Sequence, residues 1–332
     1  FTTPLMIAVQ MVSARIGWVT GRGLAANLCR VMPRGLAVLL VALLVLANTL
    51  NIAADVAAMG DALELVVGGP PHGHALLFGL ACALLPVWLN YEAMVRVLKW
   101  LTLALLAYVA VVFALHVNWG QVLTRTLMPT LAGGGSYWTM VVAVLGTTIS
   151  PYLFFWQAAQ ESEQRQQLER SGGVPVESRA FMAEHLYRIK LDTVFGMLFS
   201  NLIAFCVMLA TAITLNGHGI TEIQTTRDPA LALRPIAGDF AFLLFALGVI
   251  GTGMLAVPVL AGSAAYAVAD VFEWRAGLDH SAGEARGFYT VLVAATLIGT
   301  AIDFTPLDPI KALLWSAIAN GVVAVPIMVA MM

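Results

Sequence analysis

Residues 138–161 read WTMVVAVLGTTISPYLFFWQAAQE, an apolar segment long enough to cross a bilayer, with polar residues at its middle. Pro151 has no backbone N–H, so the carbonyls of about Thr147 and Ser150 lose their helical partners. Discontinuous helices at the bilayer midplane bind ions in many secondary transporters, where the carbonyl ends coordinate cations. An ordinary proline kink, stabilised by serine and threonine hydroxyls, is the alternative.

The composition of the whole chain requires a membrane. Sixty percent of the 332 residues are apolar and 11% are charged, whereas soluble domains carry about 25% charged residues. Such a chain cannot cover itself with a surface that faces water, but apolar helices satisfy their own backbone groups within a bilayer. We therefore predict an all-α polytopic membrane protein with a single transmembrane domain over residues 1–332. The net charge of −2 argues against nucleic-acid binding.

Hydropathy predicts nine membrane spans. They cover about 3–19, 35–58, 75–92, 100–117, 137–160, 184–215, 239–271, 288–304 and 307–332. Two polar stretches between spans, 20–34 and 161–180, are expected to form an amphipathic helix along the cytoplasmic face and a helix that emerges into the cytosol.

The basic residues predict the orientation of these spans, because cytoplasmic loops carry an excess of lysine and arginine. Thirteen of the 17 fall on one side, namely Arg15, Arg22, Arg30, Arg34, Arg96, Lys99, Arg165, Arg170, Arg179, Arg188, Lys190, Arg275 and Arg286. The other side holds Arg125, Arg227, Arg234 and Lys311. The first side is therefore expected to be cytoplasmic. Nine spans with an external first residue predict at least one further helix upstream.

Two groups of polar residues lie within predicted spans. Asn48, Asn51 and Asp55 follow i, i+3, i+7 spacing and form a polar stripe on one helix face. Charges inside a bilayer are costly, so the stripe is expected to face the bundle interior or water; hydrogen bonding to neighbouring helices is the alternative. Asn320 and Gly321 could contribute an amide oxygen to a site or allow close helix packing.

Enzymatic motifs are absent from the sequence. It contains no HExxH, GxSxG or Walker sequence. The six histidines fall in loops or at span ends, and none has metal-ligand spacing at membrane depth. We therefore expect neither an enzyme nor a resident cofactor.

Four segments carry a family resemblance: RIGWVTGRGLA (15–25), AADVAAMG (53–60), LGTTISPYLFFWQ (145–157) and RIKLDT (188–193). They resemble, in this order, the second-to-third helix turn, the third-helix aspartate, the unwound sixth helix and the seventh-helix entry of Nramp divalent-metal transporters. The resemblance implies a LeuT-like inverted-repeat bundle that covers the family's helices two to ten, with a discontinuous helix near 147–152. It also implies that a charged metal ligand comes from the family's first helix, which is not in this sequence.

Several positions depart from the family pattern. The family's sixth helix usually reads Met-Pro-His, with a second histidine five residues further on, where this chain has Ser150, Pro151, Tyr152 and Gln157. Ala58 replaces the glutamate that usually follows the third-helix aspartate. A hydroxyl in place of a thioether favours a hard ion such as Mg²⁺. The pattern is similar to the Nramp-related magnesium transporter branch, whose members look proton-uncoupled.

The resemblance implies the transport of Mg²⁺, with Mn²⁺ as the second choice, by alternating access without proton coupling. The expected contacts to the metal or its water shell are Thr147, Ser150, Gln157 and Asn320. The expected permeation path or vestibule contains Asn51, Asp55, Pro151 and Tyr152. We expect a monomer that spans a bacterial-type plasma membrane several times, with the divalent cation and the lipid bilayer as its partners.

Three alternatives remain open on sequence alone. One is a proton-coupled Mn²⁺ or Fe²⁺ carrier with a rewired relay. Another is an amino-acid carrier of the LeuT-like group, which would hold a carboxylate at the half-helix that begins at Pro151. The last is a membrane subunit that transports nothing.

Overall fold

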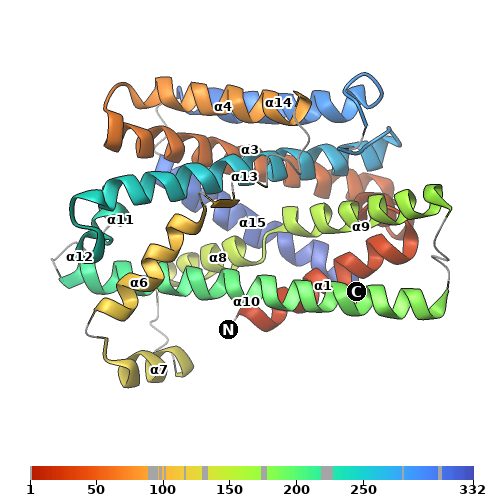
Figure 1. Cartoon of the computed structure of the whole chain (residues 1–332). Helices are drawn as coiled ribbons and strands as arrows, with labels where there is room; N and C mark the ends of the chain where they lie inside the picture. The colour runs from red at the N-terminus through yellow and green to blue at the C-terminus, as the bar shows by residue number, and fades with distance from the viewer. Residues whose placement is uncertain are drawn as a thin grey trace.

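The computed structural model describes residues 2–88, 96, 99–100, 102–115, 117–128, 134–172, 178–217, 227–278, 280–305 and 309–332. Every regular element in these ranges is helical (Figure 1). The elements are α1 (Thr2–Thr20), α2 (Leu24–Val31), α3 (Arg34–Val67), α4 (Pro71–Trp88), η1 (Leu103–Leu105), α6 (Leu106–Ala114), α7 (Trp119–Leu127), α8 (Gly135–Thr148), α9 (Pro151–Ser171), α10 (Arg179–Gly217), α11 (Arg227–Leu231), α12 (Arg234–Ala237), η2 (Gly238–Phe240), α13 (Ala241–Phe272), α14 (Arg286–Ile302) and α15 (Pro309–Met331).

Each of the nine predicted spans coincides with a helix or a pair of helices. Residues 89–92, 101, 116 and 307–308 of these spans lie outside the described residues. Six helices of the described part are long and apolar enough to cross a membrane, and the number rises to seven if the bent α6–α7 pair counts as one span. The other two predicted spans are weaker: α14 is apolar but shorter, and α1 carries the polar residues Gln10, Ser13 and Arg15.

Both polar stretches predicted between spans are helical. Helix α2 lies within 20–34, and Pro33 follows its C-terminal cap, Met32. Helix α9 continues without interruption from the apolar segment to Ser171 and ends at Gly172, whose φ of 65° favours glycine. The helix predicted for 161–180 is therefore confirmed up to its glycine stop, its emergence into the cytosol stays a prediction, and 173–177 lie outside the described residues.

The helices pack in two connected groups (Figure 1). Helices α3, α4, α13 and α14 contact one another, while α1 packs on α9 and α10. The groups are joined where α13 packs on α9, and where α15 packs on both α3 and α8, the helix that precedes α9. The junction between α8 and α9 therefore lies in the interior of the bundle, beside elements of both groups.

The outward face of α10 is apolar. Phe195, Phe199 and Leu202 are each more than half exposed, at 67%, 54% and 54%. Large apolar side chains along an exposed helix suit contact with lipid, since the hydrocarbon core accepts them without penalty. The bundle thus presents the surface that a membrane-spanning protein needs.

Candidate functional site

The segment that the sequence predicts as one span over 137–160 is broken at Ile149 and Ser150. The Ile149 N–H makes the last helical hydrogen bond of α8, to the Leu145 carbonyl at 2.8 Å. Ser150 is extended, with φ −84° and ψ 130°, as residues before proline usually are. Pro151 then opens α9, where its missing N–H costs nothing. The predicted discontinuity is therefore confirmed as a break between two helices.

Two oxygen atoms lie side by side at this break. The Ser150 hydroxyl donates to the Gly146 carbonyl at 2.6 Å and lies 3.3 Å from the Thr147 carbonyl. The Gly146 and Thr147 carbonyls belong to the C-terminal end of α8, which carries partial negative charge, and Ser150 is the residue just before α9. The Ser150 carbonyl is less available than the sequence suggests, because it accepts from the Leu153 N–H at 3.2 Å. The exposed Thr147 side chain turns back to the Val144 carbonyl, so only its backbone oxygen is placed to act as a ligand.

Helix α15 packs tightly against α8 beside the break. A Cβ on Gly146 would overlap the Ala317 carbonyl, and one on Gly321 would lie 2.7 Å from the Val142 carbonyl. Gly321 therefore serves close packing. Its neighbour Asn320 is 2% exposed, and its Oδ1 has no hydrogen-bond partner in the part of the chain that the structure describes. A buried acceptor without a partner is costly, and a bound ion or its water is one occupant that would satisfy it.

The residues of the polar stripe on α3 have different environments: one joins two helices, and two are only partly buried. Asn48 is fully buried, and its Nδ2 donates to the Leu260 carbonyl of α13 at 2.9 Å, so it joins two helices. Asn51 and Asp55 are half-buried. The Asp55 carboxylate lies within electrostatic range of Tyr152, in the first turn of α9. The fold thus places Asp55 and Tyr152, two residues of the predicted path, on helices that contact each other.

Gln157 belongs to a hydrogen-bonded chain across three helices. The Gln10 side chain of α1 donates to the Leu153 carbonyl at 3.2 Å and to Gln157 Oε1 at 3.3 Å. Gln157 in turn donates to Glu161 at 2.8 Å, and His185 of α10 lies 3.3 Å from the same carboxylate. These partners fix the orientation of the Gln157 amide, and its oxygen retains one accepting position beside Gln10.

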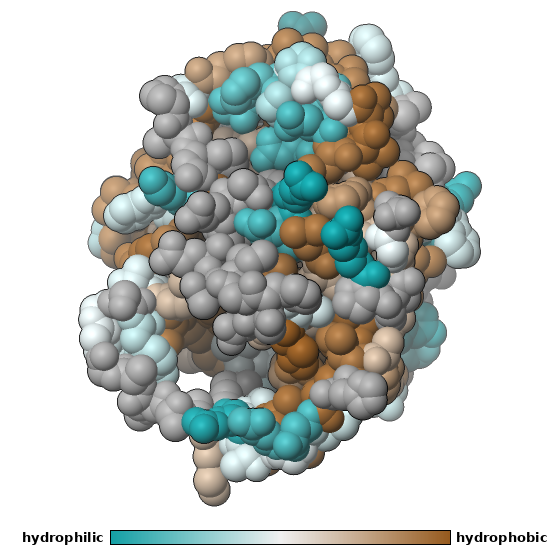
Figure 2. All heavy atoms as spheres, turned by 90° about the vertical axis from the view of Figure 1, so that its left-hand side faces the viewer, coloured by the Kyte–Doolittle hydropathy of each residue, from teal (hydrophilic) through white to brown (hydrophobic). Residues whose placement is uncertain are grey.

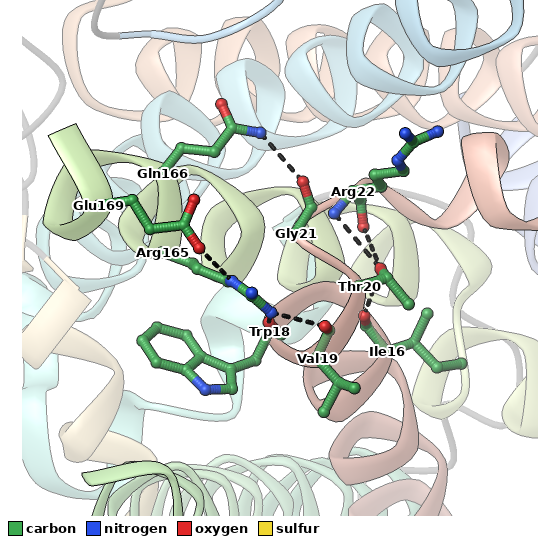
Figure 3. Close-up of polar contacts among 9 residues, drawn as sticks. All are labelled: Ile16, Trp18, Val19, Thr20, Gly21, Arg22, Arg165, Gln166 and Glu169. Carbon is green, nitrogen blue, oxygen red and sulfur yellow. Dashed lines mark hydrogen bonds and ion pairs between the residues drawn. The ribbon is translucent and has the colours of Figure 1, made fainter. Parts of the chain in front are cut away.

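Helix α9 is also fastened to the C-terminal end of α1 (Figure 3). Arg165 Nη1 donates to the carbonyls of Trp18 and Val19 at 2.8 and 2.5 Å, and Gln166 donates to the Gly21 carbonyl at 3.0 Å. The last carbonyls of a helix have no partners within it, and a basic side chain satisfies them well. The TGRG turn is therefore held by side chains from α9, about 145 residues away in sequence.

Sequence reasoning missed the residues that join α1 to α9. Besides Gln10 and Arg165, the hydroxyl of Ser13 donates to the Phe154 carbonyl at 2.5 Å. Gln10 and Ser13 lie three positions apart within an apolar segment, so they form the same kind of polar stripe that singles out Asn48 and Asp55. The spacing of Gln10 and Ser13 therefore indicates a helix face that avoids lipid, but it does not show that α9 is the helix packed against that face.

Comparisons with known proteins agree on one family. The sequence matches the family described as "Natural resistance-associated macrophage protein-like" (Nramp) over residues 1–332. It is 25% identical over 258 residues to the divalent metal cation transporter MntH of Yersinia pestis (strain Pestoides F), a match that covers 75% of this chain and 58% of the relative. A relative with the same name from Agrobacterium fabrum is 25% identical over 243 residues, which cover 70% of this chain and 50% of that protein.

The fold is similar to that of solved structures. A histidine-to-alanine variant of the Eremococcus coleocola manganese transporter superposes with a TM-score of 0.71 at 18% identity, covering 99% of this chain and 70% of that one. A glutamate-to-glutamine variant of the same transporter gives the same values. The match supports the predicted LeuT-like bundle. The chain spans between half and three fifths of the length of these relatives. It belongs to the Nramp family and is a multi-pass integral membrane protein.

Proposed function

We propose that this chain carries divalent metal cations across the membrane by alternating access, with the ion or its water shell held at the break between α8 and α9. The observation that carries this proposal is the pair of adjacent oxygens at the break, the Thr147 carbonyl in the last turn of α8 and the hydroxyl of Ser150, just before α9. On the helix packed against α8, the buried Asn320 oxygen adds an acceptor with no partner among the described residues. Oxygen donors at a broken helix suit a hard cation.

Within this function, we propose that Mg²⁺ is preferred over Mn²⁺. The donors are a hydroxyl, a carbonyl and amide oxygens, and sulfur, which favours softer metals, is not among them. The Ser150 proton is directed at the Gly146 carbonyl, so the lone pairs of the hydroxyl are free to accept from a metal-bound water or to bind the metal. Gln157 is proposed to contact the water shell through its remaining accepting position. Mg²⁺ suits this arrangement because it usually keeps several of its waters.

The proposed path passes the first turn of α9. Asp55, within electrostatic range of Tyr152, would attract the cation toward the break. Tyr152 and Asn51 are half-buried and would line the vestibule, and Pro151 fixes the angle at which α9 begins. We propose that the protein acts as a monomer in the bilayer.

We propose that this transport is not coupled to protons. Tyr152, Gln157 and Ala58 occupy positions where the Nramp resemblance places two histidines and a glutamate, and none of these three side chains exchanges protons readily near neutral pH. A proton-coupled Mn²⁺ or Fe²⁺ carrier is the second candidate, and its Mn²⁺ form shares its metal with the solved structures named manganese transporters.

A flux assay tests both candidates. The protein is reconstituted in liposomes that contain a metal indicator and a pH indicator, and Mg²⁺, Mn²⁺ or Cd²⁺ is added outside. We expect Mg²⁺ and Mn²⁺ influx with unchanged internal pH. Strong Cd²⁺ influx with matched acidification would reject the uncoupled hard-ion carrier in favour of the second candidate. No flux of any of the three cations would reject transport itself.

A further inference from the structure

Helix α7 stands apart from the helix bundle. Its axis makes an angle of 114° with that of α6, and none of its nine residues is buried. A groove of about 600 Å³ lies between α7 and α10. Figure 2 shows this end of the molecule, where hydrophilic and hydrophobic surfaces lie next to each other near the lower edge. The groove shares no residue with the proposed metal site.

The floor of this groove is apolar and belongs to α10. Phe205, Met208, Leu209 and Ile213 line it. Along a helix that rises about 1.5 Å per residue, Phe205 and Ile213 lie about 12 Å apart. One leaflet contributes about 15 Å of the roughly 30 Å hydrocarbon core. The floor therefore has the length of an acyl chain that enters from one membrane surface.

The wall formed by α7 carries polar side chains beside Val122. Asn118, Gln121 and Arg125 line it. Asn118 Oδ1 caps the helix by accepting from the Gln121 N–H at 3.2 Å, which leaves the Asn118 amide group able to donate elsewhere. Among the described residues, Arg125 makes no ion pair. A guanidinium and an amide donor thus border an apolar floor.

The exposed side chains of α7 place this helix at a membrane surface. Trp119, Leu123 and Leu127 share a face of α7 that lies away from Gln121 and Arg125, and all three are at least 44% exposed. A short amphipathic helix with tryptophan and leucine on one face and a basic residue on the other is typical of the interface between headgroups and acyl chains. At that depth a lipid phosphate lies at the level of Arg125.

We propose that the groove binds one phospholipid, with its phosphate on Arg125 and one acyl chain along α10 between Ile213 and Phe205. Arginine is well suited to phosphate because its planar donors match two phosphate oxygens. Phosphatidylglycerol should bind more tightly than phosphatidylcholine, since its headgroup carries no ammonium group to oppose the guanidinium. A free phosphate ion would leave the apolar floor uncovered and is not the expected ligand.

Native mass spectrometry of the purified protein tests this site. The protein in detergent is titrated with phosphatidylglycerol or phosphatidylcholine of identical acyl chains, and with inorganic phosphate. We expect one phosphatidylglycerol per protein, bound about tenfold more tightly than phosphatidylcholine, which corresponds to about 1.4 kcal/mol. Arg125→Gln should abolish this preference, and Arg125→Lys should retain most of it. Lys311→Gln, which removes another exposed cation on the same predicted side of the membrane, should change nothing.

A second variant tests the apolar floor. Met208 is 54% exposed, so Met208→Trp fills the groove without entering the helix core. It should weaken the binding of both phospholipids about tenfold while Arg125 remains. Equal affinity for the two lipids in the unchanged protein would overturn the proposal, as would tight binding of inorganic phosphate alone. Unaltered lipid binding in both Arg125→Gln and Met208→Trp would overturn it as well.

Discussion

Arg165 is the side chain whose loss should most weaken the attachment of α9 to α1. Its Nη1 donates to the carbonyls of Trp18 and Val19 at the end of α1, and its Nε lies 2.7 Å from Glu169 (Figure 3). The arginine side chain is 18% exposed, so water cannot fully replace these bonds. We predict that Arg165→Gln destabilises the folded protein, because glutamine is too short to reach both carbonyls.

The size of this effect follows from the contacts. A hydrogen bond that involves a charged group contributes about 1.5–3 kcal/mol. The two hydrogens of Nη1 can serve one carbonyl each, and because the bond to Val19 is exposed to water we count the two bonds at about 2–4 kcal/mol in total. The pair with Glu169, whose side chain is 46% exposed, adds only about 0.3–0.5 kcal/mol. Nearly all of the loss should therefore come from the separation of α9 from α1.

Thermal unfolding in detergent measures this loss. Arg165→Gln should lower the unfolding temperature clearly, while Glu169→Gln should lower it slightly. Arg170→Gln is the matched control, since it removes the same group five positions further along α9, where the described residues offer it no ion pair. If Arg165→Gln and Arg170→Gln unfold at the same temperature, the contacts between α9 and the end of α1 do not stabilise the protein as we argue.

Three further substitutions test the interior of the bundle. Gly146→Ala should destabilise the folded state by about 1–3 kcal/mol or more, because its Cβ meets the Ala317 carbonyl; Gly196→Ala on α10 has open space and should be neutral in the same unfolding assay. Asn48→Ala should cost about 1 kcal/mol in that assay, since it removes the hydrogen bond that its amide donates to the Leu260 carbonyl of α13. Asp55→Asn should reduce cation flux into liposomes about tenfold or more while the unfolding temperature stays within a few degrees of the unchanged protein; undiminished flux would exclude Asp55 from the path.

The positions of the helices could be predicted because local patterns specify them. Runs of about 20 apolar residues predict spans, and Gly172 stops α9 as a glycine after a polar helix should. The polar residues Gln10 and Ser13 lower the hydropathy of α1 as a membrane span. In the structure both donate hydrogen bonds to α9. Gln10 and Arg165 join helices that are far apart in the sequence, and hydropathy has no information on which helices become neighbours.

The candidate site could be predicted in part for the same reason. Pro151 specifies the break locally, so the sequence could place Thr147 and Ser150 beside it, whereas the bond from the Leu153 N–H to the Ser150 carbonyl could not be predicted. The environment of Gln157 and Asn320 depends on tertiary contacts. Gln157 is held by Gln10, which no local pattern could show, and the unpaired oxygen of Asn320 becomes apparent only once the helices around it are placed.

Ion selectivity at position 150 tests the central claim most directly. Mg²⁺ and Cd²⁺ influx are compared in liposomes that carry the unchanged protein, Ser150→Met, or Thr148→Met as a control near the break whose hydroxyl bonds back to Val144. A hard oxygen site at the break predicts that the unchanged protein prefers Mg²⁺. Ser150→Met should shift the ratio toward Cd²⁺ by about tenfold or more, and Thr148→Met should leave it unchanged. A preference for Cd²⁺ in the unchanged protein, or the same ratio in all three proteins, would contradict the account.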